Sequence, residues 1–257
     1  YSLHADVLKE LPHIAHDLLL GASLKPKDPD YVYADLHLHI PRTASMRKVI
    51  EEASQRIDIC AIVTREPKYD ADGGYLDFDT AVEKLKREDI PIVKEDEDGR
   101  FVQVKYNNRP FYLVRAIEVY GKEGQELVII GNDKEFKDNR VNNTPLDDLI
   151  AEANDVGSLC FIDHPMSIGA PVIYFRYPTQ EEEKRLRTWI EKHDPIVEMG
   201  NHQNTLWMYP SNVSMQRLAK EYGLAQVTNS DSHFRLREIG LSRTGIPKYI
   251  MNTGGTG

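Results

Sequence analysis

Cysteine, net positive charge and long apolar runs are all scarce in this sequence of 257 residues. Its two cysteines, Cys60 and Cys160, both lie in apolar, strand-like runs, so we expect buried free thiols rather than the disulfide framework of a small secreted domain. No apolar stretch approaches the roughly 20 residues of a membrane-spanning helix, and no signal peptide is recognisable. We therefore expect a cytoplasmic protein without membrane contact.

The charge balance is acidic, with 41 Asp and Glu against 32 Lys and Arg and a formal net charge of -9. The charged residues are spread along the chain, which argues against a broad basic surface for nucleic acid. A small phosphorylated substrate or a nucleotide remains open as a partner, because such a ligand needs only a few local cations. The sequence does not indicate an oligomeric state.

Segments of strand and helix character alternate along most of the chain. Short apolar or β-branched runs predict seven core strands, at 31–34, 58–64, 111–119, 126–130, 158–163, 195–199 and 224–229. Helical spacing and capping patterns predict helices at 3–20, 45–57, 78–89, 144–157, 179–193 and 215–222. This alternation is typical of an α/β protein with a mostly parallel sheet, and the length suits one α/β barrel.

Two segments interrupt or precede this alternation. Residues 90–108 predict a β-hairpin with an acidic turn, which we interpret as an insertion at the rim. Residues 1–30 predict a helix and a linker that pack on a barrel domain at 31–250, and neither accessory is long enough to bury a core of its own. After Phe234 the pattern becomes irregular.

The motif Asp35-Leu36-His37-Leu38-His39 follows the first predicted strand. Residues two apart in an extended chain point to the same side, so the imidazoles of His37 and His39 project together. Paired imidazoles suit zinc, manganese or iron. One such pair is a weak signal, because many histidines serve only structure.

Other strand ends carry residues of the same chemistry, namely Glu118, His164, Asp231 and His233. The carboxyl ends of barrel strands share one face, so these side chains and the two histidines of the first motif are expected to converge there. Arg65, Glu66 and Asn201 also lie at strand ends and are expected nearby.

Taken together, the motifs resemble those of the polymerase-and-histidinol-phosphatase (PHP) superfamily of metal-dependent phosphoesterases. The resemblance is carried, in order, by Asp35–His39, Ala116–Val119, Asp163–Pro165, Val197–Asn201 and Ser230–His233. It implies a distorted, TIM-like (β/α)7 barrel. It also implies a cluster of up to three zinc, manganese or iron ions that bind a phosphate and activate water.

The resemblance implies one metal position that is complete in this chain, formed by His37, His39, Glu118 and Asp231. A second position would keep His233 and gain Glu66, and a third would keep His164 besides Glu118.

The chain departs from the family pattern at three other places. Ile40–Met46 carries no ligand, Thr64-Arg65-Glu66 stands where Thr-Asp-His is usual, and Val128 stands where a histidine is frequent. We therefore expect one tightly bound divalent ion and at most two.

The remaining polar residues have open roles. His164 and His233 could act as general acid, phosphate donor or support for a ligand. Arg65 could pair with phosphate in a fork, or form an ion pair with Glu66 or Glu118. Asp163 is expected to form hydrogen bonds within its own turn. Further candidates for substrate contacts are Arg42, Arg235, Asn201 and His202.

These observations favour a hydrolase, and within that class a phosphoesterase that uses a metal-activated water on a small phosphorylated molecule or nucleotide. The missing ligands favour a second hypothesis, a degenerate barrel that serves as a binding or regulatory module. A metal-dependent amidohydrolase ranks third, because the sequence offers no obvious lysine to bridge two metals after carboxylation.

Overall fold

The structure is a computed structural model, and it describes residues 27–65, 74–131, 136, 143–163, 165, 180–201, 205–233 and 235–249, apart from the side chains of 182 and 201–213. The helix expected at 3–20 lies outside these residues, so the role of segment 1–30 stays a prediction. The division into a barrel domain and accessories likewise stays a prediction.

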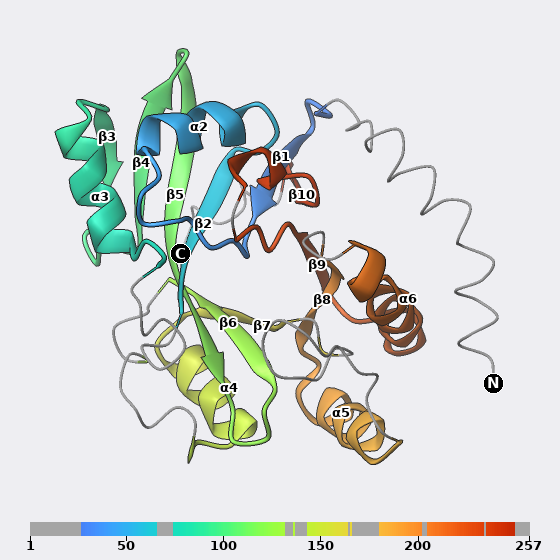
Figure 1. Ribbon diagram of the computed structural model, residues 1–257. Coiled ribbons are helices and arrows are strands. Elements are labelled where there is room, and N and C mark those ends of the chain that lie inside the picture. The colour runs from blue at the N-terminus through green and yellow to red at the C-terminus, as the bar shows by residue number, and fades with distance from the viewer. Residues whose placement is uncertain are drawn as a thin grey trace.

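One mixed sheet curls through the molecule and nearly closes on itself (Figure 1). The strands follow the order β10-β1-β2-β5-β6-β7-β8-β9, and the hairpin strands β3 and β4 join at β5. Their bounds are β1 Tyr31–Asp35, β2 Ile59–Arg65, β3 Ile92–Glu95, β4 Phe101–Tyr106, β5 Arg109–Tyr120, β6 Glu126–Ile130, β7 Leu159–Ile162, β8 Ile196–Asn201, β9 Gln226–Asn229 and β10 Thr244–Pro247. The predicted α/β, barrel-like fold and its seven core strands are confirmed.

The sheet closes at the segments that follow β1 and β9. Leu38 and Ser232 form a parallel bridge. On either side of it, the backbone N–H of Asp231 donates to the carbonyl of His37, and the N–H of His39 donates to the carbonyl of Ser232, both at 2.8 Å. The motif with the paired histidines therefore sits on the closing seam of the barrel.

Helices cover the outside of the curved sheet (Figure 1). They are α2 Met46–Ser54, α3 Phe78–Arg87, α4 Leu146–Asp155, α5 Gln180–His193 and α6 Thr205–Tyr222. Helix α3 illustrates how the sequence sets them: the side chain of Asp77 accepts from Thr80 N–H as N-cap, and the buried residues recur at helical spacing, as Phe78, Ala81, Val82 and Leu85. The α6 helix begins ten residues earlier than predicted.

The sheet is more mixed than the expected, mostly parallel one. Strand β6 is antiparallel to both β5 and β7. Its link to β5, residues 121–125, is too short for the crossover that a parallel neighbour needs. Strand β10 lies antiparallel to β1, within the region after Phe234 that the sequence analysis took as irregular.

The hairpin predicted at 90–108 is present as β3 and β4. It continues the sheet, because β4 pairs antiparallel with the first half of β5, from Phe101↔Val114 to Tyr106↔Arg109. Its acidic turn is a solvated loop, in which Arg100 Nε donates to Asp96 Oδ2 at 2.8 Å. The second half of β5 belongs to the barrel wall and carries Glu118 to the site.

Small and branched side chains fill the barrel between the strands. This cluster includes Ala34, Ala61, Ala116, Val128 and Phe161, from five different strands. Larger apolar side chains pack between the sheet and the outer helices. Most of the buried polar residues gather near the ends of the strands β1, β5, β7, β8 and β9, as expected for a barrel of this kind.

Candidate metal centre

The paired histidines come from an extended segment that is held on both sides. Val63 N–H donates to the carbonyl of Leu38 at 3.2 Å, and the seam bonds with Asp231 and Ser232 hold the other edge. Extended backbone sends alternate side chains to opposite sides. Leu38 is buried in an apolar cluster, whereas His37 and His39 turn toward the polar end of the barrel.

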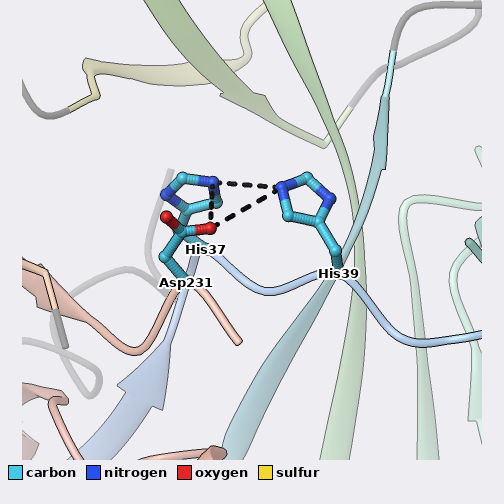
Figure 2. Close-up of side chains that lie close together, drawn as sticks. All are labelled: His37, His39 and Asp231. Atoms are coloured by element: carbon cyan, nitrogen blue, oxygen red, sulfur yellow. Dashed lines mark hydrogen bonds and ion pairs between the residues drawn. The ribbon is translucent and has the colours of Figure 1, made fainter. Parts of the chain in front are cut away.

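Two imidazole nitrogens and a carboxylate oxygen meet at one point (Figure 2). His37 Nε2 lies 3.3 Å from His39 Nε2 and 3.4 Å from Asp231 Oδ1. His39 Nε2 lies 3.9 Å from the same oxygen and 3.2 Å from Glu118 Oε2. All four side chains are at least nine-tenths buried.

The protonation of His39 follows from its other ring nitrogen. Nδ1 lies 3.1 Å from the carbonyl oxygen of Val63, which can only accept, so Nδ1 carries the proton of the neutral ring. Burial, together with the nearby His233, lowers the pKa of His39 to about 4. The ring is therefore neutral at neutral pH, and Nε2 points an electron lone pair into the site.

His37 has the same orientation with stronger partners. Its Nδ1 lies 3.0 Å from Asp163 Oδ1 and 3.4 Å from Glu198 Oε1. Burial alone would lower its pKa, but the carboxylates of Asp163 and Asp231 outweigh it and raise the pKa well above the ordinary value. A proton on Nδ1 satisfies these carboxylates and leaves Nε2 as the nitrogen that faces His39.

Glu118 lies between His39 and Arg65. Its Oε2 accepts from Arg65 Nε at 2.9 Å, and its Oε1 is buried without a hydrogen-bond partner among the described residues. Burial would raise its pKa, but Arg65 and His39 hold the pKa well below the usual range. Of the two ion pairs considered for Arg65, the structure shows the one with Glu118.

Asp231 and His233 come from the turn after β9. Asp231 has a left-handed backbone with a φ of 47°, a conformation that costs free energy and is common at functional sites. Burial opposes its ionisation, but His37 and His233 lower its pKa below the ordinary value. His233 Nδ1 lies 2.9 Å from the Asp231 carbonyl, and its ring centroid lies 4.5 Å from that of His39.

An outer layer of polar residues supports His37, and the sequence analysis gave none of them a site role. Asp163 was expected to bond within its own turn, yet it lies against His37. Glu198 accepts from Asn229 Nδ2 at 2.8 Å, and burial and Asp163 raise its pKa to about 8. The signal that could have found Glu198 is a carboxylate within the otherwise apolar run of β8.

The arrangement fits a divalent cation. When Nδ1 carries the only proton of each ring, the two Nε2 lone pairs and the oxygens of Glu118 and Asp231 converge on one place, where either a divalent cation or a proton on His37 Nε2 can offset their mutual repulsion. Partners on Nδ1 are also what orients metal-bound histidines. Two overlapping groups of three have ligand atoms close enough for one ion: His37, His39 and Asp231, and His37, Glu118 and Asp163.

The other predicted site residues are placed less centrally or lie outside the description. Arg42 is exposed, and Arg235 is 63% exposed with Nη1 3.7 Å from Glu238. Asn201 ends β8 and pairs with Asn229, but its side chain is not described. Glu66, His164 and His202 lie outside the described residues, so their roles stay predictions.

Comparisons with known proteins find likeness in structure alone. No protein-family model matches the chain, and no curated protein matches it. The crystal structure of PsfC from Pseudomonas syringae PB-5123 has a TM-score of 0.50 at 14% identity, covering 84% of this chain and 82% of that one. This similarity shows a shared fold.

Two further solved structures score lower. One is a "putative metal-dependent phosphoesterase" from Bifidobacterium adolescentis, with a TM-score of 0.48 at 12% identity, covering 84% of this chain and 92% of that one. The other is the lesion-specific endonuclease PfuEndoQ from Pyrococcus furiosus, with a TM-score of 0.46 at 14% identity, covering 79% of this chain and 48% of that one.

The shared fold agrees with the α/β barrel that the sequence resemblance implied, and the described residues place buried candidate metal ligands at its strand ends. Among the described helices, none has the length and apolar character to cross a membrane.

Proposed function

We propose that this protein is a metal-dependent phosphoesterase that acts on a small phosphorylated molecule or a nucleotide. The single observation that carries the proposal is the 3.3 Å approach of His37 Nε2 to His39 Nε2, with Asp231 and Glu118 beside them. Two imidazoles and two carboxylates buried in one place suit a divalent cation, and zinc, manganese and iron favour imidazole with carboxylate.

Each residue has a definite task in this proposal. His37, His39, Asp231 and Glu118 hold the ion, which when bound supplies a water of lowered pKa and shields charge on phosphate oxygens. Asp163 and Val63 orient the two imidazoles through Nδ1. His233 lies against His39 and could deliver a proton to the leaving oxygen; His164 is the alternative for that role.

A phosphatase screen with defined metals tests the proposal. Metal-free protein is loaded with zinc, manganese or iron and assayed with phosphomonoesters, phosphodiesters and nucleotides. We expect turnover that is lost in Asp231→Ala and kept in Asp155→Ala, a matched change at an exposed aspartate on α4. Failure of every metal to support hydrolysis of any ester in a folded, metal-loaded protein would refute it.

One observation favours the second function, a binding or regulatory barrel. Glu118 is already engaged by Arg65, and an ion pair of this kind competes with a metal for the carboxylate. Such a module would bind metal and phosphate without turnover, which the same screen detects when binding is measured beside activity.

The amidohydrolase hypothesis has less support. A dinuclear site of that type needs a lysine inside the barrel, and among the described residues no lysine side chain is buried.

A further inference from the structure

We propose that Arg65 acts as a built-in cation at this site: it shares Glu118 with a single divalent ion, takes the place of a second ion and binds the substrate's phosphate. This inference rests on the proposed function and deepens it, because it names the charge that would otherwise come from another metal. Three features of the described residues support it.

The first feature is the way the sheet presents the two side chains. Arg65 is the last residue of β2, and it stands directly opposite Glu118 in the parallel register of β2 and β5. Side chains at such positions point to the same face of a sheet. Arg65 Nε is 2.9 Å from Glu118 Oε2, and the same oxygen is 3.2 Å from His39 Nε2. One carboxylate oxygen therefore joins the guanidinium to the metal ligands.

The second feature is that the two candidate ligand groups share His37. A neutral imidazole offers one lone pair, so it can bind one ion at a time. Nε2 faces His39 and Asp231, and Nδ1 faces the carboxylate of Asp163 at 3.0 Å. Asp163 thus acts as the acceptor that orients His37, and one ion lies at His37, His39 and Asp231. The remaining carboxylate, Glu118, has Arg65 as its second cationic neighbour.

The third feature is the exposure of Arg65. Its side chain is 20% exposed, whereas the Glu118 side chain beside it is fully buried. The bond to Glu118 uses Nε, and the structure gives the terminal nitrogens no bond to a described residue. A guanidinium held in this way can offer two parallel N–H donors to phosphate oxygens. It lies at the edge of the site, between the buried ligands and solvent.

The charges agree with a single ion. A divalent cation and one guanidinium balance the carboxylates of Glu118, Asp231 and Asp163, so the net charge is about zero with Arg65 and about -1 without it. Arg65 therefore favours the binding of an anionic phosphate. A second divalent ion beside a fixed guanidinium would be repelled strongly in this buried setting. We therefore expect one bound ion in the native protein, even with metal in excess.

Counting metal tests this inference. Native mass spectrometry and elemental analysis compare wild type, Arg65→Lys and Arg65→Gln after loading with excess manganese and dialysis. We expect one ion per chain in wild type and Arg65→Lys, and a second ion in Arg65→Gln, in which Glu118 is released. Two or more ions in wild type, or a count that stays at one in Arg65→Gln, would refute the replacement of a metal by Arg65.

Binding of inorganic phosphate tests the second half. Calorimetry on metal-loaded protein should show affinity at least about tenfold lower in Arg65→Gln and about threefold lower in Arg65→Lys, which keeps the charge and loses the fork. Arg87→Gln is the matched control, because Arg87 is 68% exposed on α3. Unchanged affinity in Arg65→Gln would show that Arg65 does not bind phosphate.

These measurements are independent of turnover. Thermal unfolding of the metal-loaded variants shows whether Arg65→Gln is folded. If it is not, Arg65→Lys still tests phosphate binding, because its ammonium group keeps a cation beside Glu118. One ion and Arg65-dependent phosphate binding without hydrolysis would refute the phosphoesterase and keep this inference. Hydrolysis by a wild-type protein that binds two ions would refute this inference and keep the proposed phosphoesterase function.

Discussion

Asp35 Oδ1 accepts a hydrogen bond of 3.0 Å from the backbone N–H of Ser230, across the seam where the barrel closes. Its other oxygen accepts from Gly240 N–H at 2.9 Å. The carboxylate is fully buried, and that burial raises its pKa to about 6. Asp35 therefore ties the segment that carries His37 and His39 to the one that carries Asp231 and His233.

Replacing Asp35 should open this seam. Asp35→Ala leaves the N–H groups of Ser230 and Gly240 buried without acceptors, which we expect to cost about 3 kcal/mol of unfolding free energy and to lower Tm by about 6–12 °C. Calorimetry on metal-free protein measures this. Asp30→Ala, at an exposed position just before β1, is the control and should unfold as wild type. A Tm for Asp35→Ala within about 2 °C of wild type would contradict the role.

Removing metal should destabilise the native protein. An ion present at about 100 times its Kd adds about 3 kcal/mol, so chelation should lower Tm by about 5–10 °C, and adding back zinc or manganese should restore it. The Tm of His37→Ala should not change when metal is removed or added. The Tm of His193→Ala should change with metal as much as that of wild type, because His193 lies away from the site and contacts Asp147, with Nε2 2.8 Å from Oδ1. Equal responses of the two variants would argue against the site.

Much of the site could be predicted from the sequence, because strand ends and residue chemistry suffice for it. His37 and His39 converge as the alternation of an extended chain requires, and Glu118 and Asp231 reach the same place from β5 and the turn after β9. The strand that carries each residue was recognisable from its apolar pattern. The barrel then brings the strand ends together.

Other features depend on neighbours that a pattern does not reveal. Strand β10 contains Gly245 and Pro247, both poor strand formers, and it exists because β1 offers it an edge. Arg65 forms an ion pair with Glu118 because the register of β2 against β5 places the two residues opposite each other. Asp163 was assigned to its own turn because its contact with His37 joins residues 126 positions apart, which no local pattern encodes.

Asp163 should control the tautomer of His37. In Asp163→Asn the amide can donate to Nδ1, which moves the ring proton to Nε2 and blocks the metal-binding lone pair. We expect metal affinity to fall about 10–100-fold, as measured by competition with a chelator of known affinity. Asp155→Asn, at an exposed residue of α4, is the matched control. Unchanged affinity in Asp163→Asn would show that the carboxylate does not orient His37.

Metal binding should also depend on pH through His37. The pKa of this ring is raised above its ordinary value by Asp163 and Asp231 against the opposing effect of burial, so the metal-free protein holds a proton on Nε2 at neutral pH. His39 has a pKa of about 4 and is already neutral, so it contributes no proton. An ion must displace the His37 proton to bind, because Nε2 cannot hold both.

Raising the pH removes the competing proton from His37 and therefore strengthens metal binding. Below the pKa of His37 we expect Kd to fall about tenfold for each pH unit, with about one proton released per ion. Chelator competition at pH 6, 7 and 8 gives the slope. Calorimetry in two buffers of different ionisation enthalpy gives the proton count. In Asp163→Asn, which lacks one of the two charges that raise the pKa, the slope should level off at lower pH. A Kd independent of pH, with no proton release, would mean that His37 is neutral before the metal arrives.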